Sequence, residues 1–443
     1  MKVAHSLLLA LLAGAALPSH AADKDKDKEI AALRAELAAL KKQNEDKIAE
    51  LEQRISDAED AQDELNDQTQ QLAIDLSQQS NRTAANTFNP GIGVVLNGKF
   101  VQAPADYQFS LPGFPLGGEG GPGDKGFQLG ESEINLSANV DDKFYGNLTL
   151  SFGDGVSVEE AFLQTLTLPD GLAVKFGRFF SSIGYLNNHH THTDDFAVRP
   201  LVYQAFLGGE SFGDDGVQLT WLAPTKLFWE SGAEWYKGDS YPAAGSANSG
   251  KGTHTLFTHV GSDLGDSWSW RAGLSWLHAK ADGRTVADTA ESFSGKSDLY
   301  IADMVWKWAP SGNTTVHNAK IQAEYFHRKE QGDFTTLDTS LLPLNSKQDG
   351  WYVQGVYQFM PQWRAGLRYE ELKADKLPMT FDGTALDNLD HDPRQWSMMV
   401  DWSNSEFSRI RFQYSRDQAS PQAANLFTLQ YIAAFGAHGA HVF

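Results

Sequence analysis

The amino-acid sequence predicts an all-β fold, a sixteen-stranded antiparallel transmembrane β-barrel preceded by an N-terminal α-helical coiled-coil segment. Three observations lead to this prediction. Sixteen short segments alternate apolar and polar residues, which is the period of a β-strand with two different faces. Short and long connections alternate between these segments. A heptad repeat without Gly or Pro precedes the first of them, and heptads are typical of coiled coils.

The first 21 residues have the pattern of a secretory signal peptide. Lys2 supplies a short positive region, residues 6–17 are apolar, and Ser19 and Ala21 place small residues at the expected cleavage site. The apolar stretch is shorter than the ~20 residues that a membrane helix needs. We therefore expect residues 1–21 to be removed and the mature chain to leave the cytoplasm.

Residues 22–87 form the second predicted region, a periplasmic coiled-coil stalk and linker. The a positions of its heptad repeat are Ile30, Leu37, Asn44, Leu51, Ala58, Leu65 and Leu72. A sustained heptad favours helices that wrap around partner chains. The d column loses its apolar residues after Leu40, so a solvated single helix is the alternative.

Residues 88–443 form the predicted barrel domain. The sixteen predicted strands are 91–103, 126–139, 143–153, 157–168, 171–180, 214–223, 226–237, 253–264, 266–278, 296–309, 318–330, 349–359, 362–373, 393–404, 406–417 and 424–434. The tight turns VDDK, LPDG, LAPT, LGDS, FMPQ and SNSE alternate with long loops. A soluble β-sandwich gives no reason for this alternation, whereas outer-membrane barrels have short periplasmic turns and long outer loops.

The composition excludes several classes of protein. The formal net charge of −21 at pH 7 argues against nucleic acid as a partner. The chain has no cysteine, so it has neither a disulfide framework nor a thiolate metal ligand. No Ser/His/Asp or paired-carboxylate arrangement predicts an enzyme. We therefore expect a protein without catalytic activity and without a cofactor.

Two segments of the barrel domain resemble a known family. The ending LFTLQYIAAFGAHGAHVF closes on Phe443, and such a terminal aromatic residue resembles the assembly signal of bacterial outer-membrane barrels. The segment EEAFLQTLTLPDGLAVKFGRFFSSIGYLNN is similar to the core of the phosphate-selective porin O and P family, where a Gly-x-Phe-type motif precedes the constriction loop. The resemblance extends over residues 89–443 and implies a sixteen-stranded, usually trimeric porin.

The longest predicted loop, residues 181–213, carries an unusual set of polar residues. They are His189, His190, His192, Asp194 and Asp195. In porins that resemble this one, the third outer loop folds inward and narrows the lumen, and the apolar residues elsewhere in this loop favour the same arrangement. We therefore expect these five side chains near the constriction, where they would attract cations. The alternative is a polar loop whose histidines form hydrogen bonds with the wall.

The histidines also suggest metal binding and a response to pH. His and carboxylate side chains suit divalent ions such as zinc, although the loop lacks the spacing of a closed zinc site. Weak and transient metal binding at His189, His190 and His192 is therefore a hypothesis. Free imidazole titrates near ~6.5, so we expect these three residues to change charge between about pH 5 and pH 8.

The polar faces of the later strands carry a row of basic residues. These are Arg271, Lys320, Arg328, Arg364, Arg368, Arg409 and Arg411. Opposite an acidic loop, such a row would create a transverse electric field that admits small ions. The alternative is the ordinary polar lining of a lumen.

Together, these patterns predict an outer-membrane porin for passive diffusion of small solutes and ions. We expect it to favour cations, divalent ions such as zinc among them, because both the loop and the barrel domain are acidic. An anion-selective or phosphate-selective porin is the first alternative. The second is an envelope-tethering protein whose stalk contacts the cell wall. The expected partners are outer-membrane lipid and, by the resemblance, two further copies of the chain in a homotrimer.

Overall fold

The structure is a computed structural model of the chain. It describes residues 35, 37–39, 41–43, 45–51, 53, 90–118, 120–153, 155–244, 252–286 and 289–436. The chain divides into two units, Met1–Thr87 and Phe88–Phe443.

The described residues of the first unit are all helical. Leu37 and Leu51, two of the predicted a positions, are 70% and 53% exposed. The other predicted a positions lie outside the described residues, and the coiled coil stays a prediction. Among the residues that the structure describes, no helix is long and apolar enough to cross a membrane.

The second unit is built from seventeen β-strands in its described residues, joined in one sheet. The strands are β1 (Gly91–Gln102), β2 (Gly126–Leu129), β3 (Ser132–Asn139), β4 (Phe144–Phe152), β5 (Val156–Thr165), β6 (Leu172–Phe180), β7 (Gly213–Leu222), β8 (Phe228–Tyr236), β9 (Thr253–Leu264), β10 (Trp268–Thr285), β11 (Ser292–Trp308), β12 (Asn318–Thr335), β13 (Leu341–Met360), β14 (Trp363–Ala374), β15 (Arg394–Ser405), β16 (Ser408–Gln418) and β17 (Ala424–Gly436). The short helices are η1 (Thr191–Thr193), α2 (Leu201–Phe206), η2 (Pro310–Gly312) and η3 (Met379–Phe381).

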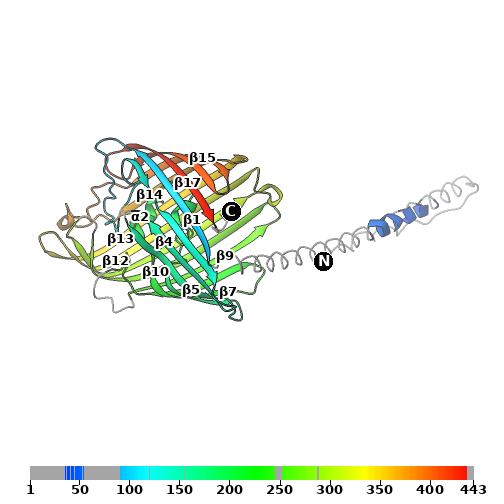
Figure 1. The fold of residues 1–443 in the computed structure, drawn as a ribbon, viewed down its shortest axis with the longest axis horizontal. Coiled ribbons are helices and arrows are strands. Elements are labelled where there is room, and N and C mark those ends of the chain that lie inside the picture. The colour runs from blue at the N-terminus through cyan, green and yellow to red at the C-terminus, as the bar shows by residue number, and fades with distance from the viewer. Residues whose placement is uncertain are drawn as a thin grey trace, which may run out of the picture. The chain divides into compact units, whose positions relative to one another are not determined.

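The sheet closes on itself. From β3 onward each strand pairs antiparallel with the next, and β1 pairs with β17 in a continuous register from Gly93 opposite Gly436 to Gln102 opposite Phe427. β2 and β3 both pair with β1, so they share one position in the wall and the seventeen strands fill sixteen positions. Figure 1 shows the ring of strands. A closed sheet has no free edge. The predicted sixteen-stranded antiparallel barrel is confirmed.

The two faces of the wall have inverted polarity compared with a water-soluble protein. Along β17, Phe427 and Tyr431 are 38% and 50% exposed on the outer face, whereas Thr428 and Gln430 are 3% and 1% exposed on the inner face. An apolar outer surface and a polar interior are typical of a barrel that lies in lipid.

Aromatic residues form two bands on the outer face of the wall. Near the short turns, Trp268 contacts Trp308 at a ring-centroid distance of 6.1 Å, and Trp363 lies opposite Trp402 across the β14–β15 pair. Toward the loop ends, ring pairs recur on neighbouring strands, such as Trp351 with Tyr369 and Trp396 with Tyr414. Two such bands are typical of the interfaces between hydrocarbon and headgroups.

Four strands are longer than the sequence predicted. β10 to β13 extend past the ends predicted for them, and the connections 286–291 and 336–340 are short. The connection 153–155 between β4 and β5 is short as well. The long loops implied by the predicted strand ends are therefore wrong at 286–291 and 336–340, whereas the predicted strands 143–153 and 157–168 agree with the short connection between β4 and β5. The extended strands form a taller section of wall.

The connection between β6 and β7, residues 181–212, is here called loop 3. Its helix α2 contacts β12, β13 and β14. Phe206 of α2 stacks on Phe326 of β12 at 5.7 Å, and both side chains are fully buried in a cluster that also includes Phe114 and Tyr352. The expected inward folding of loop 3 is confirmed, because its apolar side chains pack on inward-facing apolar residues of the wall.

Candidate functional site

Asp195 of loop 3 is bound by two cations of the wall. Its carboxylate lies 2.5 Å from Lys320 Nζ and 3.1 Å from Arg364 Nη1. Arg364 also binds Asp401 of β15 at 2.6 Å. Burial alone would raise the pKa of Asp195, but Lys320 and Arg364 outweigh it and hold that pKa below its ordinary value. Asp195 is therefore a charged anchor that joins loop 3 to β12 and β14.

Asp194 has a different role from its neighbour. It pairs with Arg199 of the same loop at 2.7 Å, and both side chains are buried. The Arg199 guanidinium also donates to the carbonyl oxygens of Leu186, at 2.8 Å, and of His189. This pair holds the loop in its own shape, whereas Asp195 attaches the loop to the wall.

Four of the predicted wall arginines donate hydrogen bonds to the backbone of loop 3. The pairs are Arg411 with the carbonyl of Asp194 (2.7 Å), Arg368 with Val198 (2.9 Å), Arg328 with Ala205 (3.3 Å) and Arg271 with Gly184 (3.4 Å). The expected row of cations facing an acidic loop across water is therefore replaced by direct contact. These arginines satisfy loop carbonyls that the fold has taken out of water.

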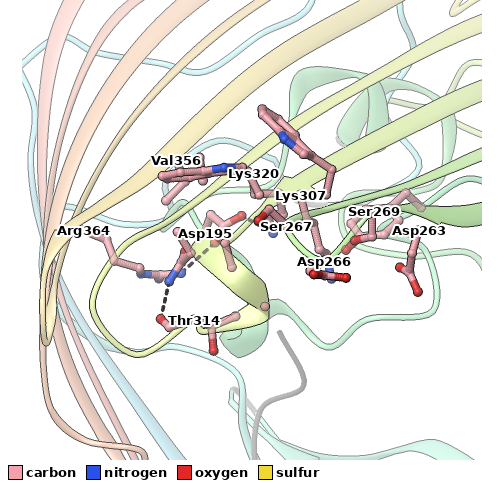
Figure 2. A pocket seen from close by; sticks show the side chains of 18 of the residues that line it. Asp195, Asp263, Asp266, Ser267, Ser269, Lys307, Thr314, Lys320, Val356 and Arg364 are labelled. Atoms are coloured by element: carbon pink, nitrogen blue, oxygen red, sulfur yellow. Dashed lines mark hydrogen bonds and ion pairs between the residues drawn. The ribbon is translucent and has the colours of Figure 1, made fainter. Parts of the chain in front are cut away.

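A cavity of about 530 Å³ opens beside Asp195, on the side of the short turns. Its charged lining residues are Asp195, Asp263, Asp266, Lys307, Lys320, Arg364 and Arg409. Figure 2 shows Arg364 and Asp195 toward one side of this cavity and Asp263 and Asp266 toward the other. Among the predicted basic residues, Arg409 is partly exposed and also lines a second cavity of about 430 Å³. Space for water thus remains inside the barrel next to loop 3.

His189 does not behave as the sequence suggested. Its ring lies 5.0 Å from the ring of Tyr185. Burial, followed by the charges of Arg199 and Lys320, lowers the pKa of His189 to about 3. His189 is therefore neutral between pH 5 and pH 8, and the expectation that all three loop histidines change charge in that window is wrong.

His190 and His192 point to a group of glutamates on the opposite part of the wall. His192 Nδ1 lies 3.0 Å from Glu133 Oε1. His190 Nδ1 lies 3.2 Å from Glu133 Oε1 and 3.2 Å from Glu159 Oε2, and its Nε2 lies 3.4 Å from Glu160. Burial lowers the pKa of His190, but these glutamates more than offset it and raise that pKa well above its ordinary value.

A β-bulge places both glutamates of β5 on the inner face. Glu160 pairs with Thr149 and Val158 pairs with Leu150, so Glu159 has no opposite residue on β4. One extra residue in a strand re-aims the side chains that follow. Strict alternation would point one of two adjacent glutamates at lipid, which would be costly. We call Glu131, Glu133, Glu159 and Glu160 the lumen glutamates.

The predicted site residues did not include the lumen glutamates, although the sequence carries a signal for two of them. Glu133 alternates with Ile134 and shares a face with Asn135 along β3, which marks an inward-facing position. Glu131 lies one alternation earlier, and its carboxylate accepts a hydrogen bond from the Thr191 hydroxyl of loop 3. Phe443, the predicted assembly signal, lies outside the described residues.

Comparison with known proteins gives a relative in sequence and several barrels among solved structures. An uncharacterized protein of Aquifex aeolicus (strain VF5) is 33% identical over 340 residues, covering 72% of this chain and 70% of the relative. OmpT of Vibrio cholerae in its trimer form covers 78% of this chain and 98% of its own (TM-score 0.48, 14% identity). The anion-selective porin of Comamonas acidovorans covers 78% and 98% (0.49, 12%), and the channel DcaP of Acinetobacter baumannii 78% and 96% (0.49, 14%).

No family model matches the chain, and the resemblance to the phosphate-selective porin O and P family stays a prediction. The relative from Aquifex aeolicus is identical to this chain at one third of the aligned positions, and the alignment covers most of both chains. Identity at this level over this length indicates common descent. This chain therefore belongs to the same protein family as the Aquifex aeolicus protein.

Proposed function

We propose that this protein is an outer-membrane channel for passive diffusion of small solutes and ions. The observation that carries the proposal is the combination of an apolar outer face with a polar interior around a closed wall. The cavities beside Asp195 supply water-accessible space inside that wall. Loop 3 narrows this space, which is the role of a constriction in a selective pore.

We further propose that the channel favours cations. Among the described residues, no Lys or Arg forms an ion pair within 4.0 Å with any of the four lumen glutamates. Most of the wall cations, in contrast, are bound to Asp195 or to carbonyls of loop 3. Four carboxylates that are offset only by loop histidines leave net negative charge beside a narrow water-filled path, and such charge raises the local concentration of cations.

Reversal potential tests this proposal. Purified protein in planar lipid bilayers should give discrete ohmic conductance steps, and a potassium chloride gradient should give a reversal potential of the sign for a cation-selective pore. Repeating the measurement with zinc and phosphate salts then ranks the permeant ions. Bilayers that stay tight at high protein loading would rule out a channel, and a reversal potential of the opposite sign would rule out cation preference alone.

An anion-selective or phosphate-selective channel is the second candidate. Lys307 and Arg409 line the cavity beside Asp195, and cations at a constriction attract anions. The variants Lys307→Gln and Arg409→Gln discriminate between the candidates. If the lumen glutamates determine a cation preference, both variants should keep that preference. If the channel is selective for anions, both variants should lose their anion permeability.

The assembly of this channel is proposed as a homotrimer in the outer membrane, with residues 22–87 as a periplasmic stalk. The exposed Leu37 and Leu51 support a partner for the helix, because an apolar seam in water is stabilised by packing against other chains. Cross-linking in mild detergent should give a trimer, and monomers alone would exclude it. Contact of the stalk with the cell wall, with the barrel as its anchor, is the structural alternative.

A further inference from the structure

Three side chains around loop 3 have the spacing of ligands on one small cation. His190 Nδ1 lies 3.2 Å from Glu133 Oε1 and 3.2 Å from Glu159 Oε2. The ligand atoms of all three residues lie within 4.8 Å of one another. Zinc binds nitrogen and oxygen at about 2.0–2.2 Å in tetrahedral geometry, so two ligands of one zinc ion lie roughly 3.3–3.6 Å apart, close to the two distances given above.

Hydrogen bonding does not account for this arrangement. An imidazole Nδ1 carries at most one proton, so it can donate to only one of the two carboxylates. Neither contact has the direction of a hydrogen bond, and both His190 Nδ1 and Glu159 Oε2 are buried atoms without a hydrogen-bond partner. Two carboxylate oxygens crowd one nitrogen, and a cation among the three atoms would satisfy all of them.

The charges around these atoms favour the same occupant. Glu133 is 3% exposed and Glu159 is 12% exposed. Burying carboxylates without a compensating charge is costly. Among the described residues, their partners within 4.0 Å are histidines and not Lys or Arg. A protonated His190 offsets part of the negative charge, and a divalent ion would supply the positive charge when His190 is neutral and free to act as a ligand.

We propose that Glu133, Glu159 and His190 form a binding site for a divalent transition-metal ion, with zinc as the best match. One imidazole and two carboxylates suit zinc better than calcium or magnesium, which prefer oxygen ligands alone. Glu160 lies 3.4 Å from His190 Nε2, and a carboxylate at the second ring nitrogen orients a metal-bound histidine. His192 holds Glu133 from the other side, at 3.0 Å.

The site joins loop 3 to the wall at a second place. Asp195 attaches the loop to β12 and β14, whereas the metal would attach it to β3 and β5 on another part of the ring. The bound ion thus fixes the position of the constriction. This role does not depend on what passes through the barrel.

Zinc binding to the full-length protein tests the site. Protein purified in detergent and stripped with a chelator should bind one zinc ion per chain in a calorimetric titration. Calcium and magnesium at the same concentration should not compete. Cobalt should bind in place of zinc and give visible absorption bands that report nitrogen and oxygen ligands. Zinc should also raise the temperature at which the barrel unfolds, because it binds only the folded chain.

The variants His190→Gln and Glu159→Gln should weaken zinc binding at least ~10-fold. We expect Glu159→Gln to fold because it removes a negative charge from a crowded group, and the gel mobility of the unheated barrel verifies the folding of both variants. The matched control is His189→Gln in the same loop, which should bind zinc like the parent. Absence of zinc binding in the parent would overturn the proposal. Equal losses in His189→Gln would overturn it as well. Glu210, with Glu131 and Glu159, forms a second group of carboxylates close enough to hold an ion, so a greater loss in Glu210→Gln than in His190→Gln would place the ion there and also overturn the proposal.

Discussion

Asp195 is the residue through which loop 3 meets the positive charge of the wall. Its two partners come from different strands, and one of them, Arg364, is held in turn by Asp401. A buried ion pair contributes little to stability when both partners are present, but removing one partner leaves an uncompensated buried charge. The contact therefore determines where the loop sits more than how stable the barrel is.

The variant Asp195→Asn should release loop 3 from β12 and β14. Breaking a buried ion pair costs about 3–5 kcal/mol, and the loss falls on the loop because the strand ladders are untouched. Single-channel conductance should rise and fluctuate more, and protease should cut the loop faster. Asp266→Asn removes the same charge from the opposite side of the cavity. This control should change neither the single-channel conductance nor the rate at which protease cuts loop 3. Equal behaviour of the two variants would show that Asp195 is not the anchor.

The anchor should survive mild acid. The pKa of Asp195 is lower in the folded chain than in the unfolded chain, because Lys320 and Arg364 outweigh the effect of burial. Its contribution is therefore fully present above the unfolded value of about 3.9, and it is lost only as pH falls through the lower folded value. Protease cutting of loop 3 should be equally slow at pH 8 and pH 5. Faster cutting at pH 5 in the parent, but not in Asp195→Asn, would contradict this.

Among the elements, the pairing of β5 with β6 depends on one glycine. Gly177, in the Gly-x-Phe motif before loop 3, has a φ of +125°. A Cβ at this position would lie 2.2 Å from the carbonyl oxygen of Ala161 on β5. The two backbones thus approach each other more closely than a side chain permits.

The variant Gly177→Ala should destabilise the barrel by roughly 1–3 kcal/mol, from backbone strain alone. The clash with β5 adds to this loss. Thermal unfolding in detergent micelles should occur at a lower temperature than in the parent. Gly355→Ala is the matched control, because a Cβ on that strand glycine would meet nothing within 4 Å. Similar unfolding temperatures for the two variants would show that the close approach carries no energy.

The strands could be predicted from sequence because lipid and water impose opposite demands on alternate residues. The segments by which β10 to β13 exceed their predicted ends, next to the connections 286–291 and 336–340, were not predicted for the same reason. Their outward residues there include Lys280, Lys296, Lys329 and Lys347, whereas Phe293, Phe334 and Leu344 point inward and belong to a buried apolar cluster. A strand that leaves the hydrocarbon no longer has an apolar outer face, so the pattern that predicts a membrane strand ends there.

The acidic loop residues could be predicted, but their partners could not. The lumen glutamates lie on β5 and around β3, and their approach to His190 depends on the fold of loop 3. The bulge at Glu159 also reverses the face of the following residues. Composition locates a residue on a strand or loop, whereas cross-strand register and bulges decide which residues meet.

For the molecule as a whole, we expect the barrel unit alone to form the proposed pore. The closure and both cavities involve only residues of Phe88–Phe443. Deleting residues 30–76 should therefore leave the conductance steps unchanged in planar bilayers. A cell that carries only this variant should still admit small solutes. Loss of conductance would assign the helix to the channel, and an envelope defect with normal conductance would support a tether.

The pairing of β1 with β17 also determines when the barrel can close during the synthesis and folding of each chain. Asn97 and Gln430, which are joined by a hydrogen bond, lie 333 positions apart. Until the last strand has been synthesised, one edge of the first strand has no partner, because its other edge pairs with β2 and β3, and an open strand edge cannot enter hydrocarbon. Contacts of such long range form slowly, and unpaired strands aggregate. Each newly made chain must therefore be kept from aggregating until its last strand is available to close the ring.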